Sequence, residues 1–422
     1  MLMMLVALAL TGLSSCHDDE DAPEVKPEQR TLFMYFPWST NLTDYFYDNI
    51  LAMEEAIAKT GLDNERVIVF ISTSSSEAEM FEITCNGGKC TRTELKTYDN
   101  PSLTTAAGIS GILSDMKTFA PADVYAMTIG CHGMGWLPVE SKYKAKGQAP
   151  AFVPHYSADK GYAMTRYFGG VTSDDQTDIS TLADAISDAG LKMEFILFDD
   201  CYMSSVEVAY DLRHVTGHII ACPTEIMAYG MPYAEIGASL LGEPDYKAIA
   251  DGFYEFYSNY DYPYGTLGIT DCSQLDALAE IMKLINSRYE FDSLQLYSLQ
   301  RMDGYTPVLF FDFGDYVEHL CPDEALLAEF KARLARAVPY AVHTEQYYSS
   351  YRGAVDINTY SGITTSEPST HSLAADVVDT NWYKATHRHR PCLPPTAAMS
   401  CAEAAAQGLR GATFHEKSVF VL

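Results

Sequence analysis

Short apolar runs along the chain predict the buried strands of a sheet. Each run is rich in β-branched and aromatic residues and is bounded by polar residues, Gly or Pro. The five runs are Thr31–Trp38, Arg66–Thr73, Val124–Gly130, Glu194–Asp199 and His218–Ala221. Their apolar residues fall on both faces, which is typical of a parallel sheet that is covered on both sides.

Between and after these runs, apolar residues recur at a helical spacing of about 3.6 residues. The predicted helices are Asn41–Lys59, Ser102–Thr118, Ile179–Ala189, Ser204–Arg213, Tyr246–Tyr260, Ser273–Asn286 and Glu324–Ala337. Strands that alternate with helices predict an α/β sandwich with a mainly parallel central sheet.

The same pattern divides the chain into regions. Residues 31–270 hold the alternating elements, and residues 271–387 form a smaller C-terminal region that we expect to pack on them. Residues 138–177 are polar and Gly-rich, which indicates a long excursion between the third and fourth strands. Residues 388–422 are more basic and Ala-rich, and we interpret them as either a poorly ordered tail or a frame error.

The N-terminal residues predict a targeting signal. The apolar run Leu2–Leu13 is too short to span a bilayer and predicts a signal peptide, although no Lys or Arg precedes it. It leads into Leu13-Ser14-Ser15-Cys16, which resembles a bacterial lipobox, so residues 1–16 would end at a lipidated Cys16 and residues 17–30 would form an acidic tether. We expect export and lipid anchoring to the cell envelope, at the outer membrane or surface. An N-terminal strand or buried helix is the alternative.

The composition and the net charge of the chain limit the classes of partner that it could bind. Hydrophobic residues make up 47% of the chain, enough for a sizeable core. The chain has 28 basic and 57 acidic residues, and the net charge of −29 disfavours nucleic acid as a partner. The same charge would attract a basic peptide, although solubility alone explains an acidic surface equally well.

Cysteine spacing gives one structural prediction. Cys85 and Cys90 flank Asn86-Gly87-Gly88-Lys89, a loop of hairpin type that would bring the two sulfur atoms together. In an oxidising compartment this pair is predicted to form a disulfide.

The candidate chemistry lies at the ends of two successive strands. His132 follows the strand Val124–Gly130, and Cys201 follows the strand Glu194–Asp199. Because carboxyl ends of adjacent parallel strands meet at one edge, the imidazole and the thiol are expected in one crevice. There His132 could raise the thiolate fraction and later protonate a leaving amine. The backbone N–H groups of Gly133 and Cys201 are candidates for an oxyanion hole.

Two other interpretations of these residues stay open at this point. A histidine satisfied within the core and an inert buried cysteine are the simplest. A metal site made of Cys131, His132 and Cys201 is disfavoured, because successive residues of a strand point to opposite faces. No calcium-binding loop stands out, so no metal and no cofactor is assigned.

The residues around the pair carry a family resemblance. His132-Gly133-Met134-Gly135-Trp136 and Asp199-Asp200-Cys201-Tyr202-Met203 resemble the motifs of the clostripain family of cysteine peptidases. The resemblance implies a caspase-like α/β/α sandwich and a dyad in which His132 is the general base and Cys201 the nucleophile. It also implies a thioester acyl-enzyme and cleavage after Arg or Lys.

The resemblance extends to the residues before the nucleophile. By its position Asp199 would lie in the specificity pocket, and capping of the following helix is the alternative role for this side chain. Asp200 departs from the pattern, because a small residue more often precedes the Cys, and a carboxylate there is expected to disfavour the thiolate.

Regulation and partners are implied in the same way. Family members can be processed between the dyad residues, which makes Lys142, Lys144 and Lys146 candidate self-cleavage sites. Some members respond to calcium, but no calcium site is assigned here.

We expect a monomer that acts on peptides or proteins. The alternative function is a weak or inactive lipoprotein that binds peptide or glycan, and a binder of that kind would keep its affinity in a Cys201→Ala variant.

Overall fold

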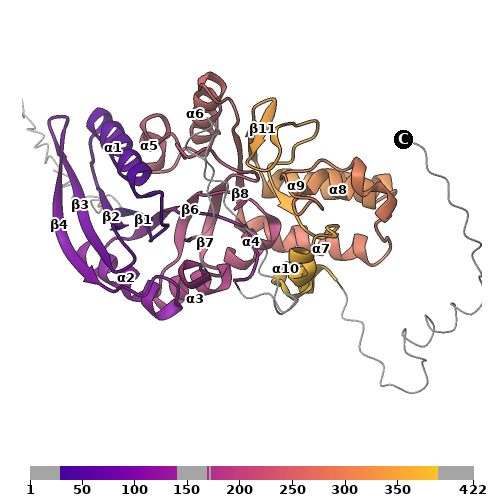
Figure 1. Ribbon diagram of the computed structural model, residues 1–422, viewed down its shortest axis with the longest axis horizontal. Coiled ribbons are helices and arrows are strands. Elements are labelled where there is room, and N and C mark those ends of the chain that lie inside the picture. Colours follow the sequence, from indigo (N-terminus) through magenta and orange to yellow (C-terminus); the bar gives the residue numbers. More distant parts are fainter. Residues whose placement is uncertain (1–28, 140–168, 171–172, 388–422) are drawn as a thin grey trace, which may run out of the picture.

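A nine-stranded sheet runs through the molecule (Figure 1). The computed structural model describes residues 29–139, 169–170 and 173–387. The order of the strands is β10-β8-β7-β6-β5-β1-β2-β3-β4. Several of the sequence predictions lie outside the described residues. They are the signal peptide with lipidation at Cys16, the tether up to residue 28, most of the 138–177 excursion with the candidate self-cleavage sites Lys142, Lys144 and Lys146, and the nature of residues 388–422.

The centre of this sheet is parallel, as the apolar runs predicted. Neighbouring strands pair in the order β2-β1-β5-β6-β7, all in the parallel sense. Their bounds are β1 Arg30–Phe36, β2 Glu65–Ser72, β5 Val124–Gly130, β6 Met193–Asp199 and β7 Thr216–Ala221. Almost every residue of these strands is buried, because helices cover both faces.

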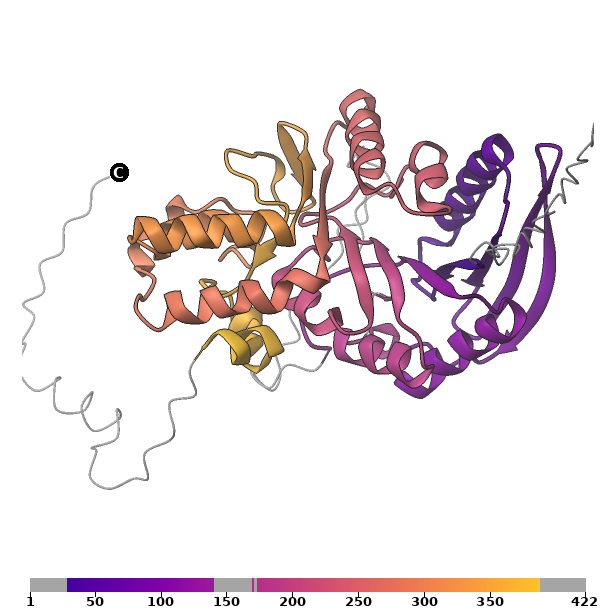
Figure 2. The same cartoon turned by 180° about the vertical axis from the view of Figure 1, so that it is seen from behind.

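Antiparallel strands complete the sheet at both edges (Figure 2). They are β3 Glu77–Asn86 and β4 Lys89–Asp99 at one edge, and β8 Thr266–Asp271 and β10 Tyr340–His343 at the other. The sequence pattern indicated only the loop between β3 and β4. The side chains of β4 are mostly exposed, and β10 has just four residues, so neither strand carries a strong apolar signal.

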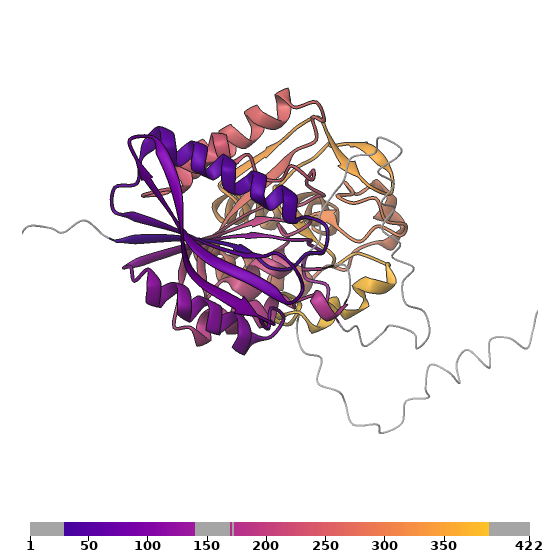
Figure 3. The ribbon, with the colours of Figure 1, turned by 60° about the vertical axis from the view of Figure 1, so that its left-hand side comes forward.

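Two layers of helices enclose the sheet, which gives the predicted α/β/α sandwich (Figure 3). One layer consists of α1 Thr43–Thr60, α5 Tyr233–Leu240 and α6 Tyr246–Asn259. The other consists of α2 Ala106–Phe119, α3 Ile179–Asp188 and α4 Val206–Leu212.

The C-terminal region is joined to this body through the sheet itself. It supplies β10, and Thr364 N–H donates to the carbonyl oxygen of Ser204 at 3.0 Å, three residues after Cys201. Its other elements are α7 Leu275–Asn286, β9 Phe311–Asp312, α8 Phe313–Leu320, α9 Glu324–Ala337, β11 Gln346–Ser349, β12 Gly353–Asp356, β13 Thr364–Thr365 and α10 Asn381–Thr386. The division between residues 270 and 271 stays a prediction.

The predicted disulfide is not formed in the structure. Cys85 and Cys90 are paired directly across the β3–β4 hairpin, as the loop suggested, yet both are free thiols. The sulfur of Cys90 contacts the carbonyl oxygen of Glu54 on α1 at 3.3 Å, and the two thiols interact with each other. The cross-strand alignment of the two cysteines agrees with the prediction, and the disulfide itself stays a prediction.

The described helices are all too short or too polar to cross a bilayer.

A pair of buried carboxyl groups ties the C-terminal region to α4. Glu207 on α4 accepts hydrogen bonds from Thr365 Oγ1 and Ser366 N–H, at 2.8 and 2.9 Å. Glu367 accepts from Trp382 Nε1 at 2.7 Å. Burial, and then the carboxyl group of Glu207, raise the pKa of Glu367 to about 8.

We predict that this pair makes the free energy of unfolding fall as pH rises. The unfolded chain releases the proton of Glu367 near pH 4.5, whereas the folded protein holds it up to about pH 8, so stability is lost between these values. Glu367→Gln keeps an acceptor for Trp382 and should remove roughly a few kcal/mol of this decline. Urea unfolding at pH 5 and pH 8 measures it, with exposed Glu255→Gln as the control. If the free energy of unfolding fell by the same amount between pH 5 and pH 8 in wild type and in Glu367→Gln, the prediction would be contradicted.

Candidate active site

The parallel pairing of β5 with β6 aligns the two candidate catalytic residues. Gly130 at the end of β5 is in register with Asp199 at the end of β6. His132 and Cys201 each lie two residues beyond this matched pair, and both are buried. The structure thus brings them to the same edge of the sheet on neighbouring segments, as the strand order required.

The backbone at Gly133 touches the backbone at Cys201. A Cβ atom built on Gly133 would lie 2.3 Å from the carbonyl oxygen of Cys201 and 3.0 Å from its nitrogen. Real side chains cannot approach backbone atoms that closely, so only glycine fits at this position. The absence of a side chain at Gly133 is what allows the His132 segment to lie against the Cys201 segment.

A side-chain clamp joins the same two segments. Asp200 Oδ1 accepts a hydrogen bond from the backbone N–H of Cys131 at 2.6 Å, and both residues are buried. The carboxylate therefore holds the end of β5 against the end of β6. The sequence indicated Asp200 only as an unusual neighbour of the thiol and gave no sign of this structural role.

The turn after β6 holds Cys201 in a constrained backbone. Tyr202 has a φ of +61°, a left-handed conformation that side-chain-bearing residues seldom adopt. Its hydroxyl donates to Glu225 Oε1 at 2.8 Å, and burial together with the Glu225 carboxylate raises the pKa of Tyr202 well above its usual value. The sulfur of Cys201 lies 3.9 Å from the carbonyl oxygen of Ile226, in the loop after β7.

Helix α4 begins later than the sequence suggested. Its N-cap is Ser205, whose hydroxyl accepts from Val208 N–H, so the first helical residue comes five positions after Cys201. The field of a helix terminus falls off within about one turn. The N-terminus of α4 therefore contributes little to the stability of a thiolate at Cys201.

The candidate oxyanion donors lie on these two turns. Two neighbouring N–H groups on these turns are already used. The N–H of His132 donates to the carbonyl oxygen of Gly169 at 3.1 Å, and the N–H of Tyr202 donates to the carbonyl oxygen of Thr224 at 3.0 Å. Within the part of the chain that the structure describes, the N–H of Gly133 donates to no acceptor. Gly133 thus has a donor available beside the thiol segment, which is what stabilisation of an oxyanion requires.

Asp199 is buried and holds the loop that leads into α5. Its Oδ1 accepts a hydrogen bond from Met231 N–H at 2.8 Å. The alternative role for this side chain, capping the helix after the nucleophile, is wrong because Ser205 caps that helix. Asp199 is instead a buried carboxylate at the same edge as Cys201, two residues before it.

Sequence reasoning missed one contact of the candidate base. His132 Nε2 lies 2.8 Å from Asn41 Oδ1, and Asn41 comes from the loop between β1 and α1. The sequence pattern places Asn41 at the start of the helix, whereas α1 begins at Thr43. The available signal was its position just beyond β1, the strand that pairs with β5.

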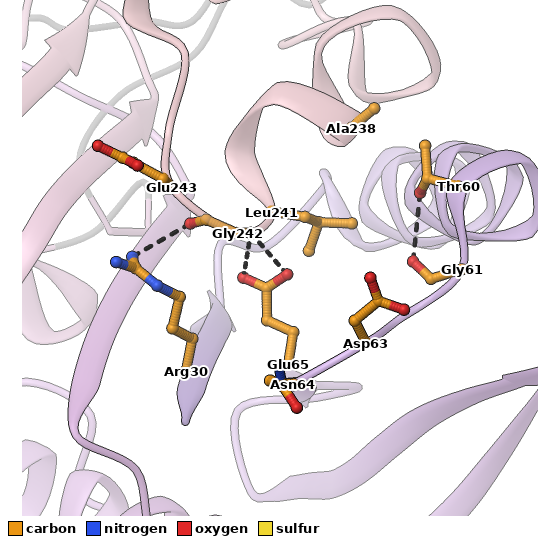
Figure 4. A pocket seen from close by; sticks show the side chains of 10 residues that line it. All are labelled: Arg30, Thr60, Gly61, Asp63, Asn64, Glu65, Ala238, Leu241, Gly242 and Glu243. Carbon is orange, nitrogen blue, oxygen red and sulfur yellow. Dashed lines mark hydrogen bonds between the residues drawn. The ribbon is translucent and has the colours of Figure 1, made fainter. Parts of the chain in front are cut away.

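Other candidate sites lie away from this edge. A pocket of about 450 Å³ opens at the start of β1 and β2, the opposite end of the strands, where Glu65 accepts from Gly242 N–H and burial raises the pKa of Glu65 (Figure 4). Among the described residues, no group of three or more His, Cys, Asp or Glu side chains could hold a metal ion. The edge of the sheet that carries His132 and Cys201 is therefore the candidate active site.

Comparison with known proteins is consistent with this geometry. A family model described as the clostripain family matches residues 34–306. A secreted C11 cysteine protease from Bacteroides thetaiotaomicron, "iotapain", is 54% identical, with a TM-score of 0.79, over 86% of this chain and 99% of that one. No curated protein matches.

Two further solved structures are similar. A clostripain from Bacteroides thetaiotaomicron in complex with the peptide inhibitor BTN-VLTK-AOMK is 62% identical over 52% of this chain and 99% of that one, with a TM-score of 0.52. An inactive zymogen C11 protease from Parabacteroides distasonis is 26% identical over 86% of this chain and 100% of that one, with a TM-score of 0.71.

We predict that Gly133→Ala slows the reaction of Cys201 about 100-fold. The added methyl group would collide with the Cys201 backbone and push the two segments apart, and a displacement of about 1 Å costs about 100-fold in rate. The measurement is the alkylation rate of Cys201, read by mass spectrometry of its peptide. Gly111→Ala on α2 is the control, because a Cβ there meets nothing within 4 Å. An unchanged rate in Gly133→Ala would show that the close approach is unimportant.

Proposed function

Because this chain belongs to the clostripain family and is a cysteine protease, we propose that it hydrolyses peptide bonds after Arg or Lys, with His132 and Cys201 as its catalytic dyad. The observation that carries the proposal is the in-register end of β5 and β6, which leads both residues to one edge of the sheet. The family match spans both residues and Asp199.

The proposed reaction uses only these groups and water. His132 takes the proton of the Cys201 thiol, and the thiolate attacks the carbonyl carbon of the substrate. The resulting oxyanion accepts hydrogen bonds from the N–H groups of Gly133 and Cys201. The intermediate collapses to a thioester while His132 gives its proton to the leaving amine. Water, with its proton taken by His132, then hydrolyses the thioester and restores the thiol.

Specificity for a basic side chain is proposed to come from Asp199. This carboxylate is buried at the nucleophile edge, and a buried carboxylate can select Arg or Lys through a charge-assisted hydrogen bond. Two observations support the assignment. The clostripain from Bacteroides thetaiotaomicron is in complex with an inhibitor whose peptide letters, VLTK, end in lysine. The net charge of −29 also favours basic substrates.

We predict that Asp199→Asn loses basic substrates selectively. The amide oxygen of Asn can still accept from Met231 N–H, so the loop should stay in place while the charge is removed. The specificity constant for peptides ending in Arg or Lys should fall about 100-fold, equivalent to about 3 kcal/mol. The measurement uses fluorogenic peptides ending in Arg, Lys, Leu or Asp. The alkylation rate of Cys201 reports whether the nucleophile is intact.

Cys201→Ala is the companion variant in this assay. It should show no turnover on any peptide. Turnover of the Leu or Asp peptide at the rate of the basic pair would refute the proposed specificity. Peptide binding without turnover in the wild type, unchanged in Cys201→Ala, would favour the binding lipoprotein instead.

Self-processing and export complete the proposal. Lys142, Lys144 and Lys146 lie between the dyad residues and fit a specificity for basic side chains, and a similar C11 protease has been solved as an inactive zymogen. Export is supported by a similar protein described as secreted, and anchoring through Cys16 by the lipobox-like residues.

One fractionation experiment tests both ideas. The full chain is expressed in a bacterium with lipoprotein export, and the membrane and soluble fractions are immunoblotted. Wild type should appear in the membrane fraction as two fragments, Cys201→Ala as a single uncut band, and Cys16→Ala in the soluble fraction. Identical uncut bands for wild type and Cys201→Ala would rule out self-cleavage. Membrane association of Cys16→Ala would rule out the anchor.

A further inference from the structure

We infer that Asn41 is a positioning residue for His132, one that fixes the orientation and the proton of its imidazole ring. The inference rests on the proposed dyad and adds a third residue to it. The observation is the hydrogen bond of 2.8 Å between His132 Nε2 and Asn41 Oδ1.

The sheet supplies the three residues from three neighbouring strands. β1 pairs with β5, and β5 pairs with β6, all parallel. Asn41 follows β1, His132 follows β5 and Cys201 follows β6. Because parallel strands end at the same edge, the amide, the imidazole and the thiol come in this order along that edge.

The hydrogen bond determines which ring nitrogen acts as the base. A carbonyl oxygen such as Asn41 Oδ1 can only accept, so Nε2 must carry the hydrogen. In neutral imidazole the lone pair is then on Nδ1, which is buried in the structure. In this tautomer Nδ1 is the ring nitrogen with a lone pair that can take the proton of Cys201. Once the ring is charged, the bond to Asn41 becomes charge-assisted and stabilises the imidazolium.

The backbone before Asn41 is held in an uncommon conformation. Thr40 has a φ of +68°, which is an outlier for a β-branched residue. Asn41 N–H donates to the carbonyl oxygen of Ser39 at 2.8 Å, and Ser39 and Leu42 are buried on either side. Strained residues of this kind persist where the surroundings fix them, and they cluster at functional sites.

Asn41 has no other evident structural task. Its side chain does not cap α1, because the N-cap is Leu42 and no side-chain cap bond is formed there. The residue is exposed, so it contributes little to the core. A contact with His132 is the one role that the described residues give to its amide.

The experiment compares Asn41→Ala with Asn41→Asp in the full chain, using kcat and KM on an Arg or Lys peptide across pH. Asn41→Ala should lower kcat about 10- to 100-fold with KM nearly unchanged. It should also move the alkaline limb of the kcat–pH profile to lower pH. The imidazolium of His132 loses a hydrogen-bond acceptor and therefore gives up its proton at lower pH. Asn41→Asp keeps the acceptor and adds a charge, so activity should be largely retained and the alkaline limb should move to higher pH.

Controls separate this role from a structural one. Asn64→Ala, an exposed asparagine at the opposite end of the strands (Figure 4), should leave kcat and the profile unchanged. Thermal unfolding should give nearly the same midpoint for all variants. Wild-type kcat and pH profile in Asn41→Ala would overturn the inference. An equal loss of kcat in Asn41→Ala and Asn41→Asp, with the alkaline limb of the pH profile unshifted in both, would also overturn the inference.

The alkylation rate of Cys201 by iodoacetamide distinguishes failure of the inference from failure of the dyad. If wild type and Asn41→Ala react equally fast and His132→Ala slowly, the dyad stands and the role of Asn41 is wrong. If wild type reacts as slowly as His132→Ala, the dyad itself is wrong and the inference falls with it. A rate for Asn41→Ala between the two supports the inference.

Discussion

The in-register contact between the ends of β5 and β6 is the constraint on which the candidate active site depends. Gly130 pairs with Asp199, and from that point the two chains run side by side long enough for Gly133 to meet the Cys201 backbone. A slip of one residue would turn the side chains of one strand to the other face of the sheet. The clamp from Asp200 to the N–H of Cys131 secures the alignment just beyond the last strand pair.

Much of this framework could be predicted from sequence, because buried parallel strands carry continuous apolar runs. All five central strands were found within a few residues of their bounds. The edge strands were missed for the opposite reason: β4 exposes most of its side chains, and β10 is short and lies far along the chain from its partner β8. Pairing, more than local composition, makes these segments strands.

The placement of the candidate site residues was predictable where they follow the ends of neighbouring strands, as at His132 and Cys201. It was unpredictable where it depends on strand order. Asn41 reaches His132 because β1 lies beside β5, although β2, β3 and β4 come between them in sequence. The partner of Asp199, Met231, comes from a loop 32 residues away. Neither contact leaves a local pattern, and the positive φ of Thr40 is equally invisible in the sequence.

Strand order also divides the sheet into two contiguous halves, β4-β3-β2-β1-β5 and β6-β7-β8-β10, and the boundary runs between the segments of His132 and Cys201. A chain cut in the excursion between β5 and β6 becomes a heterodimer of two half-sheets, held by one strand pairing and a shared core. Its refolding is then a second-order reaction between dilute fragments. Once the cut enzyme has unfolded, it does not regain its activity, so the time for which it stays active is set by its unfolding rate. The uncut chain can refold.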